Sequence, residues 1–143
     1  MTPREIFERA ASRAKELGLA YAGAVKPDEA HRLREAGAAA IVDVRTEQEL
    51  RHVGSVPGVP LVVWPRGGDA HAHAAFLEEI RARFNPGEAL LFLCRSGIRS
   101  HHAALLAARA GYARAYNVLE GFEGENGAGL NGWRAAGLPW QRS

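Results

Sequence analysis

Apolar residues follow two alternating patterns along the chain, and each pattern predicts a different secondary structure. Runs of neighbouring apolar residues predict strands, which we place at 20–25, 38–44, 61–64, 89–93 and 113–122. Between these runs the apolar residues are three or four positions apart, as on one face of a helix. The predicted helices cover 3–17, 27–36, 46–53, 70–84 and 101–110.

Residues typical of helix ends and turns support these boundaries. Thr2 is followed by Pro3, which is typical of an N-cap with proline at the first helical position, and Gly18 ends the pattern. Gly111 closes the last predicted helix, and the segment 85–87, Asn-Pro-Gly, predicts a tight turn. The helices and strands are therefore expected to alternate without long irregular connections.

Strands that alternate with helices predict the fold class. Parallel neighbours need a crossover, usually a helix, so we expect an α/β domain with a doubly wound, mostly parallel five-stranded sheet and helices on both faces. The run 89–93 is apolar at every position, as in a strand buried on both faces. Residues 1–143 are expected to form one domain, with an N-terminal helix within 1–19 and a Gly-rich C-terminal segment over 124–143.

Polar or reactive side chains follow three of the predicted strands. In doubly wound sheets the ligand crevice lies beyond the carboxyl ends of the strands, so residues at these ends are candidates for one cleft. The three tripeptides are Asp43-Val44-Arg45, Trp64-Pro65-Arg66 and Cys94-Arg95-Ser96.

Composition narrows the class of protein and of partner. Hydrophobic residues make up 47% of the 143 positions and charged residues 24%, which is typical of a globular protein. The net charge of +2 carries no block of like charges, so we expect no nucleic-acid partner. No apolar run is long enough for a membrane span, and the charged N-terminus does not resemble a signal peptide. With one cysteine no intramolecular disulfide forms, and we expect a reducing, cytoplasmic location.

The single cysteine, Cys94, stands where an apolar strand gives way to a loop. A thiolate is favoured by a helix N-terminus, by nearby cations and by inward-pointing backbone N–H groups. The sequence places all three beside Cys94, because Gly97 allows the backbone to curl, Arg95 and Arg99 are cationic, and a helix begins near Ser100. The alternative is that Cys94 is a core residue, since free cysteines are often buried.

The spacing within the loop separates two kinds of cysteine chemistry. A tyrosine phosphatase-type loop has five residues between its nucleophilic cysteine and its arginine. Here four residues separate Cys94 from Arg99, and Ser100 stands where the phosphatase arginine would be. A loop one residue shorter suits a smaller group than phosphate, such as the terminal sulfur of a persulfide.

The segment CRSGIRS after an apolar strand resembles the active-site loop of single-domain rhodaneses, the thiosulfate sulfurtransferase family. The similarity covers roughly residues 22–140, with one departure, because Ser55 replaces the histidine that is usual in the family's Gly-His-Ile-Pro-Gly turn. The further matching segments are IVDVRTEQEL (41–50), GSVPGV (54–59), NVLEGFEG (117–124) and NGWRAAGLPW (131–140).

The resemblance implies a double-displacement reaction without a cofactor. Cys94 would take the outer sulfur of thiosulfate or a related small anionic donor and pass it, as a persulfide, to cyanide, a thiol or a carrier protein. Arg99, with Arg95, would bind the sulfonate of the donor. The loop residues implied to hold the persulfide are Arg95, Ser96, Gly97, Ile98, Arg99 and Ser100.

Other functions remain open at this point. The protein could be a persulfide carrier with weak turnover, a silent interaction module or a cysteine phosphatase. The intact Cys94 argues against a silent module, and the loop spacing argues against a phosphatase. We expect Asp43 and Arg45 to support the structure as an ion pair. We expect no metal site, since the histidines lack a neighbouring cluster of ligands. Trp64 either walls the cleft or packs in the core, and 124–132 is expected to be a surface loop rather than a flap.

Overall fold

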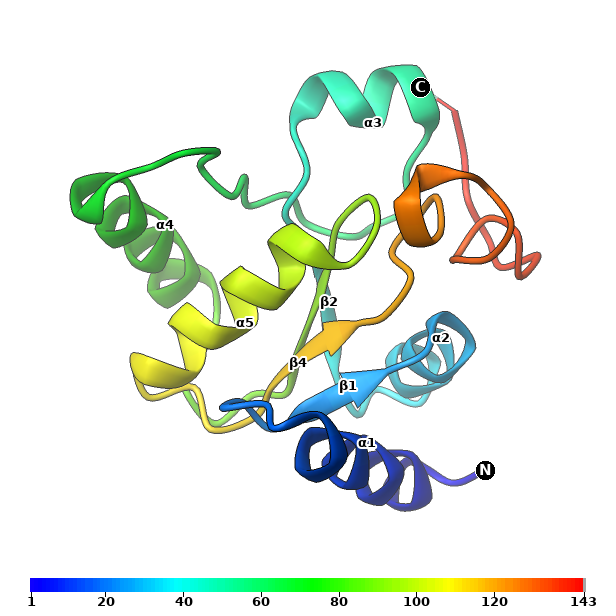
Figure 1. Cartoon of the computed structure of the whole chain (residues 1–143), viewed down its shortest axis with the longest axis horizontal. Coiled ribbons are helices and arrows are strands. Elements are labelled where there is room, and N and C mark those ends of the chain that lie inside the picture. Colours follow the sequence, from blue (N-terminus) through cyan, green and yellow to red (C-terminus); the bar gives the residue numbers. More distant parts are fainter. Residues whose placement is uncertain (143) are drawn as a thin grey trace.

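The computed structural model describes residues 1–142 and shows a parallel sheet between two layers of helices (Figure 1). The strands are β1 (Gly23–Val25), β2 (Ala40–Asp43), β3 (Leu90–Leu93) and β4 (Ala115–Val118). The helices are α1 (Pro3–Leu17), α2 (Pro27–Glu35), α3 (Glu47–Val53), α4 (Ala70–Arg83), α5 (Ile98–Arg109) and the 3-10 helix η1 (Glu125–Gly127). The predicted α/β class with helices on both faces is confirmed.

The sheet has the order β1-β4-β3-β2, and every pair of neighbouring strands is parallel. Alternate residues of β3 point to opposite faces, so Leu90 and Phe92 pack with α4 and α5, whereas Leu91 and Leu93 pack toward α1 and α2. Because β3 lies inside the sheet with helices on both sides, its four residues are buried. The residue that follows β3 is thereby fixed at the carboxyl edge.

The helix boundaries agree closely with the sequence signals. In α1, the Thr2 hydroxyl accepts a hydrogen bond from the Glu5 N–H, and Glu5 in turn accepts from the Thr2 N–H, while Gly18 ends the helix in the left-handed conformation. Thr46 and Glu49 form the same reciprocal cap at the start of α3. The predicted N-cap at Thr2 is confirmed, and the cap at Thr46 agrees with the predicted start of the helix over 46–53.

The predicted strand at 61–64, the third of the five, is reduced to an isolated bridge. The Val62 N–H donates to the Asp43 carbonyl (2.9 Å) and the Trp64 N–H donates to the Val44 carbonyl (3.0 Å), so the segment runs along the outer edge of β2. Pro60 and Pro65 flank it and have no N–H to extend the ladder. The described sheet therefore has four strands, and the segment 61–64 lies where a fifth strand would pair with β2.

Other boundaries also differ from those predicted, and β1 begins at Gly23 instead of residue 20. The last helix begins at Ile98, three residues earlier than expected, because the left-handed Gly97 already turns the chain into the helix. The last strand is β4, shorter than the predicted 113–122, because the chain turns at Glu120 and Gly121, which both have positive φ. The latter two differences tighten the segments around Cys94.

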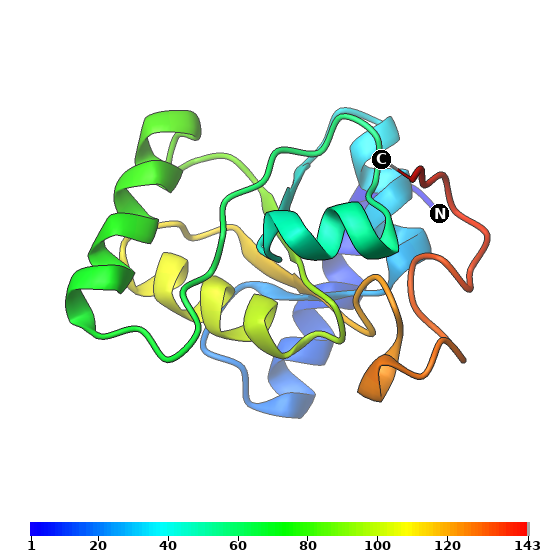
Figure 2. The same cartoon turned by 90° about the horizontal axis from the view of Figure 1, so that it is seen from above.

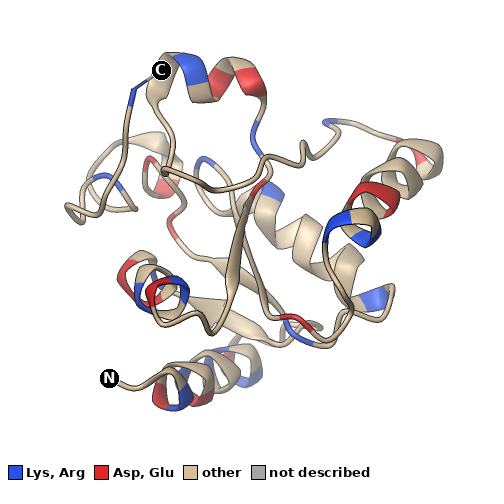
Figure 3. Ribbon diagram, turned by 180° about the vertical axis from the view of Figure 1, so that it is seen from behind, with Lys and Arg blue, Asp and Glu red and all other residues tan. Residues whose placement is uncertain are grey.

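The carboxyl edge of the sheet carries the connections relevant to function. The loop between β3 and α5 lies beneath α3, and the segment after β4 returns beside it (Figures 1 and 2). Charged residues lie mainly on helices and loops, while the strands are almost free of them (Figure 3). Within residues 1–142, no helix combines the length and the apolar character needed to cross a bilayer.

Candidate active site

Cys94 directly follows β3 and lies at the bottom of the loop that leads into α5. The residue is 1% exposed, and its Sγ accepts a hydrogen bond of 3.1 Å from the Gly97 N–H. Gly97 has a φ of 101°, a conformation that side chains rarely adopt, so glycine allows the loop to curl back toward the sulfur. The loop therefore points a backbone N–H at the only thiol of the chain.

Ser100 and Asn117 complete the polar surroundings of the sulfur. The Ser100 Oγ lies 3.1 Å from the Cys94 Sγ and donates to the Asn117 Oδ1 at 2.5 Å. The Asn117 Nδ2 donates to the Gly97 carbonyl at 3.2 Å, so one side chain from β4 holds both ends of the turn. Sequence reasoning missed Asn117, and a polar residue inside the apolar run of β4 is the signal that indicates it.

The segment after β4 supports the loop from the other side. The Phe122 N–H donates to the Cys94 carbonyl (2.8 Å), and the Glu123 N–H donates to the Arg95 carbonyl (2.9 Å). This approach requires Gly121, because a Cβ there would lie 2.5 Å from the Arg95 carbonyl carbon. Two backbone hydrogen bonds and one close contact thus fix the start of the loop.

Arg99 is held by Glu49 of α3. Its two terminal nitrogens each donate to a different carboxylate oxygen of Glu49 at 2.7 Å, and its side chain is 13% exposed. Burial alone would raise the pKa of Glu49, but the hydrogen bonds from Arg99 and Thr46 and the Arg99 charge lower it to about 2. Arg66 lies 3.8 Å from the same carboxylate and is 65% exposed. Sequence reasoning did not place Glu49 at this site.

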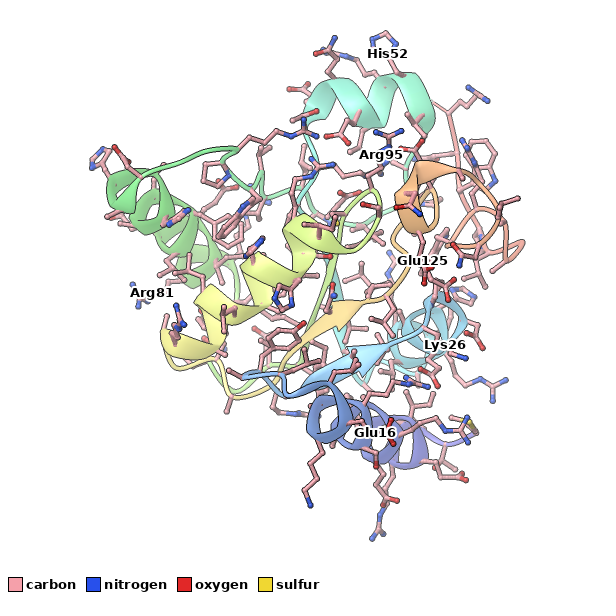
Figure 4. All side chains as sticks on the ribbon, viewed as in Figure 1. Glu16, Lys26, His52, Arg81, Arg95 and Glu125 are labelled. Atoms are coloured by element: carbon pink, nitrogen blue, oxygen red, sulfur yellow. The ribbon has the colours of Figure 1, made fainter. Side chains whose placement is uncertain are left out.

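Arg95 has a carboxylate partner of its own. Its Nε lies 3.1 Å from the Glu123 Oε2, and its side chain is half-exposed. The guanidinium also lies against Gly127, where an added Cβ would meet a terminal nitrogen at 2.7 Å. Figure 4 shows Arg95 between α3 and the segment that contains η1. Residues 124–132, predicted to be a surface loop, therefore contact the candidate site through Gly127.

Asp43 and Arg45 form a buried ion pair next to the loop. Arg45 donates from Nη2 and Nε to Asp43, with contacts of 2.7 and 3.0 Å, and its backbone N–H donates to the same carboxylate. The guanidinium also donates to the Gly54 carbonyl and lies 4.4 Å from the centre of the Phe122 ring. Both side chains are buried, so the pair connects β2, the turn after α3 and the segment after β4.

A cavity of about 380 Å³ opens at the mouth of the loop. Trp64 forms part of its wall while also packing against His73 and Phe76, so this residue combines the two alternatives left open by its sequence position. A larger cavity, of about 490 Å³, lies against α1 and α2 and includes no residue of the loop. The smaller cavity is the candidate for substrate because it alone of the two adjoins the loop that follows Cys94. It is lined by Trp64, Arg66, Gly67, Arg95, Ser96, Ile98 and Arg99.

Ser55, which replaces the histidine usual in the family turn, forms backbone hydrogen bonds with Gln141. Its N–H donates to the Gln141 carbonyl and its carbonyl accepts from the Gln141 N–H, at 2.9 and 2.8 Å. The turn thereby anchors the C-terminal segment away from Cys94. In the part of the chain up to residue 142, no three His, Cys, Asp or Glu side chains converge in a group that could hold a metal ion.

The fold and the loop define a class of protein: a parallel α/β domain with one cysteine at the carboxyl end of an inner strand, whose sulfur accepts a backbone N–H at the start of a helix. The chain belongs to the rhodanese-like domain family, whose family model matches residues 26–126. This membership confirms the resemblance seen in the sequence.

Individual relatives agree with this assignment. An uncharacterized protein of Rickettsia prowazekii, RP600, is 37% identical over 105 residues, which cover 71% of this chain and 81% of the relative. The crystal structure of Rv0390 from M. tuberculosis is 42% identical, with a TM-score of 0.73, and covers 87% of this chain and 100% of that one. The human single-domain sulfurtransferase TSTD1 is 26% identical, with a TM-score of 0.54, over 69% of this chain and 90% of that one.

Proposed function

We propose that the protein is a sulfurtransferase that carries sulfur as a persulfide on Cys94. The observation that carries this proposal is the Cys94 Sγ itself, which lies inside a curled loop and accepts a hydrogen bond from the Gly97 N–H. A nucleophilic cysteine needs this kind of polar, cation-rich setting, and a buried structural cysteine does not. Membership of the rhodanese-like family and the name of the human relative support the same chemistry.

The reaction consists of two displacements at sulfur. Cys94 loses its proton to water, and its thiolate attacks the outer sulfur of thiosulfate; a new S–S bond forms, the S–S bond of thiosulfate breaks, and sulfite leaves with the electron pair. Cyanide or a thiolate then attacks the terminal sulfur of the persulfide. The S–S bond to Cys94 breaks, the Cys94 thiolate returns, and thiocyanate or a new persulfide is released.

The mouth of the loop supplies positive charge for an anionic donor. Arg66 is the most exposed of its three arginines and makes the weakest ion pair, at 3.8 Å from Glu49, whereas Glu49 and Glu123 hold Arg99 and Arg95 at 2.7 and 3.1 Å. Arg66 is therefore the side chain that first meets the donor, and the sulfonate of thiosulfate binds between Arg66 and Arg99 once Glu49 shares Arg99 with it. Arg95, Ser96, Gly97, Ile98 and Ser100 surround the transferred sulfur in this proposal.

The paired arginines favour a second candidate, a persulfide carrier that turns over thiosulfate slowly. Each carboxylate lowers the attraction of its arginine for a dianion. A donor with less charge, such as a small persulfide, loses less from this pairing, and the acceptor is then a thiol or a carrier protein. A reducing compartment such as the cytoplasm suits either role, because both depend on one reduced thiol.

The test is the mass of the intact protein after incubation with thiosulfate or with a small organic persulfide. A gain of one sulfur atom, lost on addition of cyanide and absent from the Cys94→Ser variant, is expected. Loading by the persulfide but not by thiosulfate identifies the carrier. An unchanged mass with both donors, together with Cys94-dependent hydrolysis of an aryl phosphate, rejects sulfur transfer in favour of phosphatase chemistry.

A further inference from the structure

Ser100 has one proton and two acceptors beside it. Its hydroxyl is fully buried, with the Cys94 Sγ at 3.1 Å and the Asn117 Oδ1 at 2.5 Å. The shorter contact is that of a strong hydrogen bond, and an amide oxygen can only accept. The Ser100 proton therefore points to Asn117, and the thiol of Cys94 donates its own proton to the Ser100 oxygen.

The orientation of the Asn117 amide is fixed by a third contact. The Asn117 Nδ2 donates to the Gly97 carbonyl at 3.2 Å. If the amide turned over, its oxygen would face that carbonyl oxygen, and two acceptors would meet without a proton. The amide therefore keeps its oxygen toward Ser100 in both the thiol and the thiolate form of Cys94.

We propose that Asn117 is a positioning residue that keeps the Ser100 proton away from the Cys94 thiolate. The thiolate then retains the Gly97 N–H as its donor but gains nothing from Ser100, because turning the hydroxyl toward sulfur leaves the buried Asn117 oxygen without a donor. The effect of Asn117 on Cys94 is thus indirect and passes through one hydroxyl group.

This arrangement favours the loaded form of the site, a consequence that rests on the proposed function. In the persulfide the negative charge lies on the terminal sulfur, so the missing donor destabilises the thiolate but hardly affects the loaded cysteine. A thiolate with fewer donors is also the better nucleophile and the poorer leaving group. Asn117 therefore promotes loading of sulfur and slows its premature release.

Charged and titratable groups lie on the elements around this site, and the variants proposed below substitute none of them, although Asn117 also hydrogen-bonds to Tyr21. Arg99 is close enough for the Cys94 charge to raise its pKa, behind the larger effect of its hydrogen bond to Glu49. Beside Asn117, burial raises the pKa of Tyr21 to about 12, and the Tyr21 hydroxyl is bonded to His101 Nδ1 at 2.6 Å. The remaining groups are Asp43 and Arg45 at β2, Arg95 in the loop, and Glu120 and Glu123 after β4.

The test is the pH midpoint of Cys94 alkylation by iodoacetamide, which requires no sulfur donor. Asn117→Ala frees the Ser100 proton for the thiolate, so the midpoint is expected to fall by about one pH unit, the size of one added hydrogen bond. Asn117→Asp keeps the acceptor and adds negative charge, so its midpoint is expected to rise, although it loses the donor to the Gly97 carbonyl as Asn117→Ala does. A loosened loop would instead move both variants in the same direction, which contradicts the proposal.

Ser100→Ala is the deciding control, because the two explanations predict different shifts of its alkylation midpoint. If Ser100 donates to Asn117, its removal takes away only an acceptor of the thiol proton, and the midpoint stays or falls. If Ser100 donates to the thiolate, the midpoint rises and the proposal is overturned. In the Ser100→Ala background, Asn117→Ala is expected to have no further effect, and an undiminished shift there also overturns it. Thermal unfolding of each variant establishes that it is folded. If Asn117→Ala does not fold, the midpoint of Ser100→Ala alone decides between the two explanations.

The effect on sulfur is measured separately. At a pH above the alkylation midpoints of both proteins, where Cys94 is fully deprotonated, Asn117→Ala is expected to load more slowly from thiosulfate and to release sulfur faster to cyanide, each by about threefold. If the alkylation midpoints shift as expected but no variant takes up sulfur, the proposed function fails while the role of Asn117 stands. If sulfur is transferred but the midpoints do not shift, the role of Asn117 fails alone.

Discussion

Glu49 holds Arg99 in a two-pronged ion pair, although Arg99 is the residue whose loop position implies binding of an anionic donor. The two side chains come from α3 and from the first turn of α5, fifty positions apart in the sequence. If Arg99 binds the donor as proposed, the anion meets a guanidinium that already has a partner, and the strength of that pair then determines how firmly the anion is bound.

Glu49→Gln is expected to strengthen the binding of thiosulfate. The variant removes the competing charge, and the KM for thiosulfate should fall roughly two- to fivefold, as for the loss of a partly exposed ion pair. Steady-state kinetics at low salt measure this change. The matched control is Glu47→Gln on the same helix, which is far more exposed and leaves the KM unchanged. An unchanged or higher KM in Glu49→Gln would show that Arg99 does not bind the donor.

The same pair sets a pH window for stability. Because the pKa of folded Glu49, about 2, lies below its ordinary value of 4.5, the pair stabilises the fold fully above about pH 4.5 and stops doing so as the pH falls toward 2. Urea unfolding at several pH values is the measurement. Wild type should exceed Glu49→Gln in stability by a constant amount above pH 5, and the difference should shrink below pH 4.5. A difference that does not depend on pH contradicts this prediction.

Gly121→Ala is expected to disrupt the cysteine loop. The new Cβ would lie 2.5 Å from the Arg95 backbone, and the positive φ adds a further cost. We therefore expect the free energy of unfolding to fall by about 2–4 kcal/mol and most sulfur loading to be lost. Gly37→Ala is the control, because Gly37 has a similar φ of 69° and open space around it. The free energy of unfolding of Gly37→Ala should fall by only about 1 kcal/mol, and this variant should load sulfur normally. Equal effects of the two substitutions argue against the close approach as the cause.

Asp43→Asn is expected to cost about 3–5 kcal/mol in the free energy of unfolding, because it leaves the buried Arg45 charge without its partner. Chemical unfolding measures this loss. The exposed Arg4–Glu8 pair of α1 is the comparison, and Glu8→Gln there should cost less than about 1 kcal/mol. A small loss in Asp43→Asn would mean that the Gly54 carbonyl and the Phe122 ring suffice to hold Arg45.

Arg66→Ala is expected to slow the capture of thiosulfate without affecting stability. Arg66 is exposed at the cavity mouth, so kcat/KM should fall several-fold at low salt and approach wild type at high salt, where exposed charges are screened. Arg4→Ala, which is exposed on α1, is the control and should change nothing. A salt-independent loss would indicate that Arg66 shapes the cavity instead of attracting the anion.

The local sequence pattern predicts the elements of this fold well, because capping residues and apolar runs act over a few positions. Thr2 and Thr46 begin their helices as predicted, and the apolar run before Cys94 forms an inner strand. The segment 61–64 was predicted less well, because pairing at a sheet edge depends on the flanking prolines and on the neighbouring strand.

The sequence pattern could not predict contacts between segments that are distant in the chain. The bond from Arg99 to Glu49 and the bond from Ser100 to Asn117 join residues that only the packed fold brings together. A charge such as that of Glu49 on a short helix usually faces solvent, so nothing in its local pattern distinguishes it from Glu47. The loop with Cys94 was predictable because its residues are consecutive, whereas the side chains that tune it were not.

The burial of Cys94 limits which reaction partners its sulfur can meet. With only 1% of the residue accessible, two copies of the chain cannot join through a disulfide while the loop keeps its shape, and bulky oxidised thiols are excluded in the same way. In the proposed function, a slender donor reaches the sulfur by presenting its terminal sulfur end-on through the cavity at the mouth of the loop. The fold thereby protects its only thiol by size, before charge or chemistry discriminates among the reagents that reach it.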